Sequence, residues 1–188
     1  MARIDPPSRL GLAATASRWY ARRRYGSDLA PTAVWAHRTG LMLGYGALEF
    51  AFERSGKVDE RLKMLAELKA AAIAGCEWCM DFGSMLSRKT GISERELVEL
   101  PRYRESDAFS ELDRLVLDYA VAVSLTPVEV PDDLFERLRE HFDEAQLVEL
   151  TTAIALENFR ARFNYALGLE SQGFTEGGVC AVPERLPA

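Results

Sequence analysis

Two cysteines three residues apart are the clearest candidates for chemistry in this chain. Cys76 and Cys79 lie in the segment GCEWCMDFG, residues 75–83. On a helix, positions i and i+3 lie on nearly the same face, so the two sulfurs can approach each other. If Cys76 begins a helix, the unpaired backbone N–H groups and the positive end of the helix dipole stabilise a thiolate there. The thiolate is the nucleophilic form of cysteine, so this placement favours reactivity.

The spacing alone leaves two interpretations open. The pair is either a redox centre or two small side chains buried in a core, as free cysteines often are. A zinc site needs four ligands, and the other soft donors, Cys180, His37 and His141, show no paired spacing. A thioredoxin-like fold would place strands around the motif, and no stretch alternates as a strand. We therefore expect neither a metal nor any other cofactor.

Helices must position the cysteines, because the apolar pattern around them is helical. Residues 58–75 place Leu62, Leu65 and Leu68 at helical spacing and stop at Gly75. The next helix is then expected to start around Cys76 and to run to Gly91.

The rest of the chain also predicts helices, with proline and glycine between them. Serine followed three residues later by an acidic residue, at Ser93 and again at Ser110, is a capping-box pattern that marks a helix start. The expected helices cover residues 8–24, 31–54 with a break near Gly40, 93–100, 110–125, 130–142 and 143–167. The sequence thus predicts an all-α, single-domain protein.

Length, composition and charge exclude several classes of protein. A chain of 188 residues suits one domain with a sizeable core. The net charge of −6 argues against a general binder of nucleic acid or of anionic membranes. There is no apolar run long enough to span a membrane and no signal-peptide pattern, so we expect a cytoplasmic location. In that compartment a close cysteine pair is more typical of catalysis or metal binding than of a structural disulfide.

The stretch AELKAAAIAGCEWCMDFGSML resembles the core motif of the carboxymuconolactone decarboxylase and alkylhydroperoxidase-D-like family. That motif is a helix carrying a glutamate, a short turn, and Cys-x-x-Cys opening the next helix. The flanks APTAVWAHRTGLMLGYGALEFAF and VPDDLFERLREHFDEAQLVELTTAIALENFRARFNYALG are similar to the family's approaching and closing helices. We therefore expect a core of the alkylhydroperoxidase-D-like type at 30–170, after an N-terminal helix and linker at 1–29 and before an irregular tail at 171–188.

The resemblance implies roles for three residues. Cys79, the second cysteine, would attack a peroxide, and Cys76 would resolve the product as a disulfide. Glu67, nine residues before Cys76, would accept the thiol proton. The other interpretation of Glu67 is a solvated carboxylate beside Lys63.

The family's histidine is missing from the motif. It commonly follows the second cysteine by four residues, where this chain has Gly83. A histidine there would share a helix face with Cys79 and could exchange protons with it. His141, expected on the apolar side of its helix, and His37 are candidates for the proton relay, with a structural histidine as the alternative in each case.

Two further side chains stand out in apolar or glycine-rich surroundings. Glu157 lies among apolar residues and is expected to pair with Arg160 or Arg162. Cys180 lies in the glycine-rich tail and is a third redox thiol only if the tail folds over the pair.

These patterns together predict an enzyme, a thiol peroxidase that reduces a hydroperoxide and is recycled by an external dithiol. One alternative is an acid–base enzyme of the decarboxylase type acting on a lactone or carbon acid, against which the scarcity of histidines counts. The other is a non-enzymatic, redox-sensing helical assembly. The family implies homo-oligomers, and residues 41–52, LMLGYGALEFAF, look apolar on more than one face.

Overall fold

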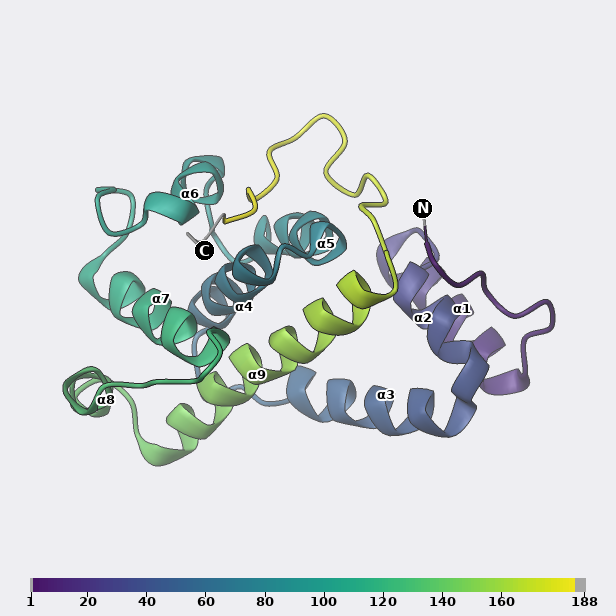
Figure 1. Cartoon of the computed structure of the whole chain (residues 1–188), viewed down its shortest axis with the longest axis horizontal. Coiled ribbons are helices and arrows are strands. Elements are labelled where there is room, and N and C mark those ends of the chain that lie inside the picture. Colours follow the sequence, from purple (N-terminus) through teal and green to yellow (C-terminus); the bar gives the residue numbers. More distant parts are fainter. Residues whose placement is uncertain (1, 185–188) are drawn as a thin grey trace. The chain divides into compact units, whose positions relative to one another are not determined.

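The computed structural model describes residues 2–184, and these residues contain helices and no strand (Figure 1). The all-α prediction is therefore confirmed. The helices are α1 (Leu12–Tyr25), α2 (Ala30–Trp35), α3 (Thr39–Glu53), α4 (Glu60–Ala74), α5 (Glu77–Ser87), α6 (Glu94–Glu99), α7 (Glu111–Ser124), α8 (Asp132–Arg139) and α9 (Glu144–Ala166), with short 3-10 turns η1 (Ala36–Arg38) and η2 (Leu100–Arg102).

The expected capping signals begin the expected helices. Ser93 caps α6 and Ser110 caps α7, each in a complete capping box with the acidic residue three positions later. Asp59 caps α4 by accepting a hydrogen bond from the backbone N–H of Arg61. Gly75 ends α4 with φ 69°, a left-handed conformation that glycine adopts without steric cost.

Several boundaries differ from the expectation, among them the end of α8 at Arg139 and not at residue 142. Helix α1 begins at Leu12 instead of Ser8, because no side chain caps its start and the backbone of Gly11 takes the N-cap position. The break in the second helical stretch lies at η1 and not near Gly40, since Arg38, with φ −134° and ψ 76°, leaves the helical conformation. Helix α5 ends at Ser87 and not at Gly91.

The chain forms two compact units. The first contains the residues up to Arg54 together with Leu167–Leu169, and the second contains Ser55–Ala166 and the residues from Glu170 onward. The first unit packs α1, α2 and α3 against one another. The expected division at residues 30 and 170 within one domain stays a prediction.

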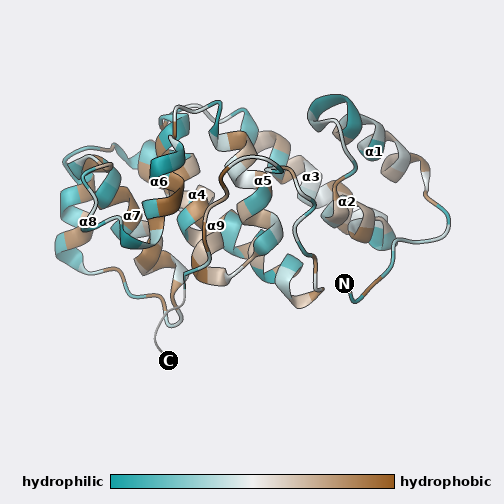
Figure 2. Cartoon of the chain, turned by 90° about the horizontal axis from the view of Figure 1, so that it is seen from above, coloured by the Kyte–Doolittle hydropathy of each residue, from teal (hydrophilic) through white to brown (hydrophobic). Residues whose placement is uncertain are grey.

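Helix α4 is the centre of the second unit. It packs against α9, α7 and α5, and it lies between them in Figure 1. Its residues Ala66, Ala70 and Ala72 are fully buried, and such small side chains let neighbouring helices approach closely. The helix also buries charged side chains, Lys63 and Lys69. Helix α8 alternates between hydrophilic and hydrophobic residues along its ribbon in Figure 2, as expected of a helix that buries only one face.

A buried ion pair joins the start of α4 to α9. The Lys63 ammonium lies 2.8 Å from a Glu149 carboxylate oxygen, and both side chains are buried. Glu149 also accepts hydrogen bonds from the Ser55 hydroxyl and from the backbone N–H groups of Lys57 and Val58. Burial opposes ionisation of Glu149, but these donors outweigh it and lower its pKa to about 2. The pair therefore holds the central helix in register with α9.

Helix α3 of the first unit exposes much apolar surface. Leu41, Leu43, Leu48 and Phe50 are exposed, and Met42 is the buried residue of this helix. Homo-oligomerisation through such a surface stays a prediction. None of the helices within residues 2–184 combines the length and apolar character that crossing a membrane requires.

Candidate active site

Cys76 occupies the N-cap of α5, as the sequence predicted. Its backbone is extended, with φ −81° and ψ 96°, and its sulfur accepts a hydrogen bond from the Cys79 backbone N–H at 3.2 Å. The left-handed Gly75 directly before it lets α4 turn into α5 within two residues. The sulfur therefore lies at the positive end of the α5 dipole, where a thiolate is stabilised.

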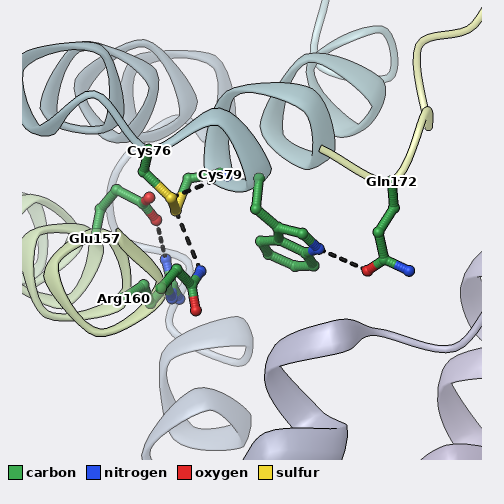
Figure 3. Close-up of a disulfide and its surroundings, with 7 residues drawn as sticks. Cys76, Cys79, Glu157, Arg160 and Gln172 are labelled. Atoms are coloured by element: carbon green, nitrogen blue, oxygen red, sulfur yellow. Dashed lines mark hydrogen bonds and ion pairs between the residues drawn. A yellow bond between two sulfur atoms is a disulfide. The ribbon is translucent and has the colours of Figure 1, made fainter. Parts of the chain in front are cut away.

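The two cysteines of the motif form a disulfide bond (Figure 3). Their Cα atoms are 5.3 Å apart, within the usual range for a disulfide. Cys76 is 1% exposed and Cys79 is 6% exposed, so the bond is buried and Cys79 is its more accessible partner. The pair is thus both buried in the core and covalently linked.

A cluster of charged residues faces the disulfide from helices α9 and α4. The Arg160 guanidinium lies 3.0 Å from Glu157 and 3.2 Å from Glu67, and all three side chains are largely buried. Figure 3 shows Glu157 and Arg160 on the side of α9 that faces the cysteines. The expected pairing of Glu157 with Arg160 is confirmed, whereas Arg162 bonds to the Asn158 side chain.

Glu67 is not the solvated carboxylate of the alternative interpretation. Its side chain is 14% exposed and pairs with Arg160 across the helix interface. The Lys63 ammonium instead bonds to Glu149 and Glu60. The structure therefore brings Glu67 into the same cluster as Glu157, beside the cysteine turn.

Asn164 is a site residue that the sequence interpretation missed. Its side-chain N–H donates to the Cys79 sulfur at 3.4 Å, and the residue is 2% exposed. It lies seven residues after Glu157, two helical turns further along the same face of α9. The signal in the sequence was a set of polar residues, Glu157, Arg160 and Asn164, at i, i+3 and i+7 along one face of the helix.

Gly83 is not an open position that a histidine could fill. A Cβ atom at this position would lie 2.9 Å from Cδ2 of Leu68 on α4, and Leu68 is 1% exposed. Position 83 does lie one turn after Cys79, but it faces the neighbouring helix. Glycine allows α4 and α5 to approach each other here, so a histidine requires the Leu68 side chain to shift before it can serve in a proton relay.

Replacing Gly83 by histidine should destabilise the protein without increasing its activity. Overpacking of a buried contact typically costs about 1–3 kcal/mol, and the better helix propensity of a non-glycine residue offsets at most about 1 kcal/mol. Urea denaturation should show a lower free energy of unfolding. In the double variant Leu68→Ala/Gly83→His the two losses should be less than additive, since the smaller residue makes room. A Gly83→His protein of unchanged stability and faster peroxide reduction would contradict this.

His141 is not brought to the cysteines. His141 is exposed and lies beyond the end of α8, in the turn before α9, so it is not on an apolar helix face. Asn164 is near the other end of α9, about 30 Å away at 1.5 Å per residue. His37 is exposed in the first unit, where its Nε2 hydrogen-bonds to the backbone carbonyl of Asp5 at 2.9 Å.

The tail is irregular over its described part and packs along α5. Its main anchor is the buried carboxylate of Asp81, which accepts hydrogen bonds from the Ser171 hydroxyl, the Thr175 hydroxyl, and the backbone N–H groups of Gln172, Phe174 and Thr175. Burial raises the pKa of this carboxyl, but the five donors outweigh burial and hold it below its ordinary value. We call residues 170–184 the strap.

The strap also contacts the residue between the two cysteines. The Trp78 indole N–H donates to the Gln172 side-chain oxygen at 2.6 Å, the dashed line that ends on Gln172 in Figure 3. The Trp78 ring stacks on Phe82 with a centroid separation of 4.8 Å. Phe174 of the strap meets both rings edge-on. Trp78, Phe82 and Phe174 therefore form an aromatic cluster next to the turn that bears the disulfide.

Cys180 lies in the strap next to α5, but away from the cysteine pair. Its sulfur accepts a hydrogen bond from the Ser84 hydroxyl at 3.8 Å, and Ser84 follows Cys79 by more than one helical turn. Burial is the main cause that raises the pKa of the Cys180 thiol, which makes it a weak nucleophile. The tail thus folds over the helix of the pair, and Cys180 remains a free thiol.

No ligand set for a metal is visible in the part of the chain that the structure describes. Residues 2–184 contain no group of three histidine, cysteine, aspartate or glutamate side chains that could hold a metal ion. The carboxylates of Glu67 and Glu157 bond to Arg160. The chemistry that this arrangement offers is that of two thiols, two carboxylates and one guanidinium.

The fold and the site define an all-helical protein whose Cys-x-x-Cys pair opens a helix beside a carboxylate–arginine cluster. The family model of the carboxymuconolactone decarboxylase family matches residues 40–122. The uncharacterised protein YnjA of Escherichia coli K12 is 35% identical over 184 residues, which cover 97% of this chain and 98% of YnjA. The chain belongs to the carboxymuconolactone decarboxylase family.

Solved structures agree with this assignment. One is a protein of unknown function from Agrobacterium tumefaciens, ATU0492, whose description suggests the antioxidant defence protein AhpD. It is 30% identical to this chain with a TM-score of 0.69, and the match covers 73% of this chain and 94% of ATU0492. An uncharacterised peroxidase-related protein from Ralstonia eutropha JMP134 with an alkylhydroperoxidase AhpD core matches 92% of this chain and 94% of its own with a TM-score of 0.80. At 20% identity the second likeness concerns the fold alone. The predicted alkylhydroperoxidase-D-like fold is confirmed.

Proposed function

We propose that this protein is a thiol-dependent peroxidase that reduces hydroperoxides with the Cys76–Cys79 pair. The observation that carries the proposal is the disulfide at the start of α5, where the helix dipole favours the thiolate that forms when the bond is reduced. A structural disulfide needs no such placement. The description of one solved relative, the protein from Agrobacterium tumefaciens linked to antioxidant defence, supports the same class of reaction.

The reaction is balanced with the groups of the site and one external reductant. The Cys79 thiolate attacks the O–O bond of the hydroperoxide and becomes a sulfenic acid, while the leaving alkoxide takes a proton and departs as the alcohol. The Cys76 thiol then condenses with the sulfenic acid, which releases water and forms the disulfide. An external dithiol restores both thiols by exchange and is itself oxidised to a disulfide.

The exposures of the two cysteine residues support Cys79 as the attacking residue. Cys79 is the more accessible partner of the bond, at 6% against 1%, whereas Cys76 is the N-cap and is almost fully covered. Glu67 is the proposed base that takes the proton of the attacking thiol, and its ion pair with Arg160 fixes the position of its carboxylate. Glu157 shares the same arginine and is the second carboxylate available to carry the proton.

The proposal is tested with reduced protein and a hydroperoxide. One equivalent of hydroperoxide should be consumed per protein, and two thiols should be lost with it. Trypsin should then release residues 70–88, which contain both cysteines of the pair, with two hydrogens fewer, while Cys180 is found unmodified in residues 163–185. A small dithiol should turn this single reaction into continuous consumption.

Two outcomes would overturn the proposal. If the pair stays reduced and Cys180 alone reacts, the protein is not a peroxidase of this kind. If the pair forms its disulfide but the dithiol supports no turnover, the pair belongs to a redox-sensing protein. The Cys180→Ser variant is the control, because it should behave as the wild-type protein does.

A further inference from the structure

We propose that Asn164 is a catalytic residue that stabilises the Cys79 thiolate by donating its side-chain N–H to the sulfur. This inference rests on the proposed function for its role in turnover, but the interaction with the sulfur stands without it. The hydrogen bond runs from Nδ2 of Asn164 to Sγ of Cys79 at 3.4 Å. The donor and the sulfur come from different helices, α9 and α5, so neither helix alone creates the contact.

The strength of this hydrogen bond depends on the state of the sulfur. A disulfide or thiol sulfur is a weak acceptor, whereas a thiolate is a charged acceptor and makes a charge-assisted hydrogen bond. The bond is therefore stronger in the reduced, ionised state than in the oxidised state. An interaction that strengthens only in the reactive state increases reactivity, because it does not stabilise the other states equally.

The charges around the pair explain why a neutral donor is useful there. Glu67 on α4 and Glu157 on α9 bring two carboxylates, and Arg160 on α9 brings one positive charge. Carboxylates beside the pair oppose formation of a thiolate. Asp81 on α5 is directed to the strap. Asn164 offers a donor to the sulfur without adding a charge, and it cannot be titrated away.

Burial holds the Asn164 amide in place. The residue is 2% exposed on a helix that packs against α4 and α5, so its side chain has little freedom to turn to water. A donor that is positioned before the reaction costs no reorganisation when the charge develops. Asn164 thus donates a hydrogen bond to the Cys79 sulfur, as the Cys79 backbone N–H at the start of α5 does to the Cys76 sulfur.

The test uses the pKa of Cys79 as its first readout. In a Cys76→Ser/Cys180→Ser background Cys79 is the single cysteine, and its ionisation is followed by thiolate absorbance or by the pH dependence of alkylation. Asn164→Leu, which keeps the approximate volume but removes the donor, should raise the thiol pKa by about one unit, since hydrogen bonds to charged groups are worth that much or more. Asn164→Ala should do the same and covers the case in which leucine does not fit.

Asn158 provides the matched control. It is also a buried asparagine of α9, and its amide donates to the Ser124 hydroxyl and to the Ile154 carbonyl, away from the cysteines. Asn158→Ala removes a buried amide from the same helix and should leave the Cys79 pKa unchanged. An equal rise of the pKa in both variants would show a general loosening of α9 and would overturn the proposal.

The midpoint potential of the wild-type pair is the second readout, and it separates thiolate stabilisation from a structural role. At a pH above the thiol pKa, Asn164→Leu should make the potential more negative by about 30 mV, the equivalent of a tenfold change for two electrons. At a pH well below the thiol pKa the two potentials should converge, because protonated thiols do not benefit from the donor. A shift that is the same at every pH would contradict the assignment.

The outcomes also distinguish this proposal from the proposed function. If the wild-type protein consumes no hydroperoxide while Asn164→Leu still raises the Cys79 pKa, the peroxidase proposal fails and the role of Asn164 stands. If hydroperoxide is consumed and the pKa and potential of Asn164→Leu match the wild type, the role of Asn164 fails and the peroxidase proposal stands.

Discussion

The Cys79→Ser variant should lose hydroperoxide reduction, by on the order of a thousandfold or more. A serine hydroxyl at this position is not ionised near neutral pH and has no sulfur to accept the peroxide oxygen, so the first step has no nucleophile. Peroxide consumption by the reduced variant with a dithiol donor measures the loss. The fold should be preserved, because serine replaces a thiol of similar size.

The Cys76→Ser variant should behave differently, and the comparison assigns the two cysteines. It keeps the attacking thiol, so it should consume one equivalent of hydroperoxide and stop at the sulfenic acid of Cys79, since the partner that would form the disulfide is gone. A sulfenic acid trap should label Cys79 in this variant. If the label appears on Cys76 of the Cys79→Ser variant instead, the two roles are exchanged.

Removing the carboxylate of Asp81 should release the strap and destabilise the protein by on the order of 3 kcal/mol. Five hydrogen-bond donors meet at this buried group, and hydrogen bonds to charged acceptors are worth more than neutral ones. Release of the strap lets water hydrogen-bond to those donors, and this limits the decrease in the free energy of unfolding. Denaturant unfolding of Asp81→Ala gives the free energy.

Cys180 reports on the strap directly. With the Cys76–Cys79 pair oxidised, Cys180 is the free thiol of the chain, and it is half-buried against Ser84. A thiol reagent should therefore modify Cys180 faster in Asp81→Ala than in the wild type. Equal rates and equal stability of the two proteins would mean that Asp81 does not hold the strap.

The contribution of Asp81 should also depend on pH. Its pKa in the folded protein is below the ordinary value of 3.8, so its ionisation stabilises the fold above that value. The contribution is lost as the pH falls through the folded-state pKa. The difference in unfolding free energy between the wild type and Asp81→Asn should therefore be full at pH 7 and should shrink below about pH 4, because asparagine does not titrate there.

Local signals in the sequence were enough to predict the helices and the position of the cysteine pair. Gly75 ends one helix and Cys76 begins the next, and both features follow from the backbone preferences of two neighbouring residues. The capping boxes at Ser93 and Ser110 are equally local. The pairing of Glu157 with Arg160 could be predicted because the two residues are three positions apart, within one helical turn.

Contacts between distant segments could not be predicted in the same way. Asn164 meets Cys79 across 85 positions of sequence, and nothing near either residue specifies that α9 and α5 cross at that register. The anchoring of the strap on Asp81 spans about as many residues, and a glycine-rich tail carries no periodic pattern. The contact between position 83 and Leu68 likewise depends on how closely α4 packs against α5.

The contact between Gly83 and Leu68 has a consequence for how this active site can evolve. A histidine at position 83 meets the leucine, and a smaller residue at position 68 without the histidine leaves a cavity that costs about 2–5 kcal/mol. Either substitution alone lowers fitness through stability, so the two positions form an epistatic pair. Lineages with a histidine after the second cysteine should carry a small residue at the position of Leu68, and lineages with a large residue there should have found another partner for the sulfur, as Asn164 is in this chain.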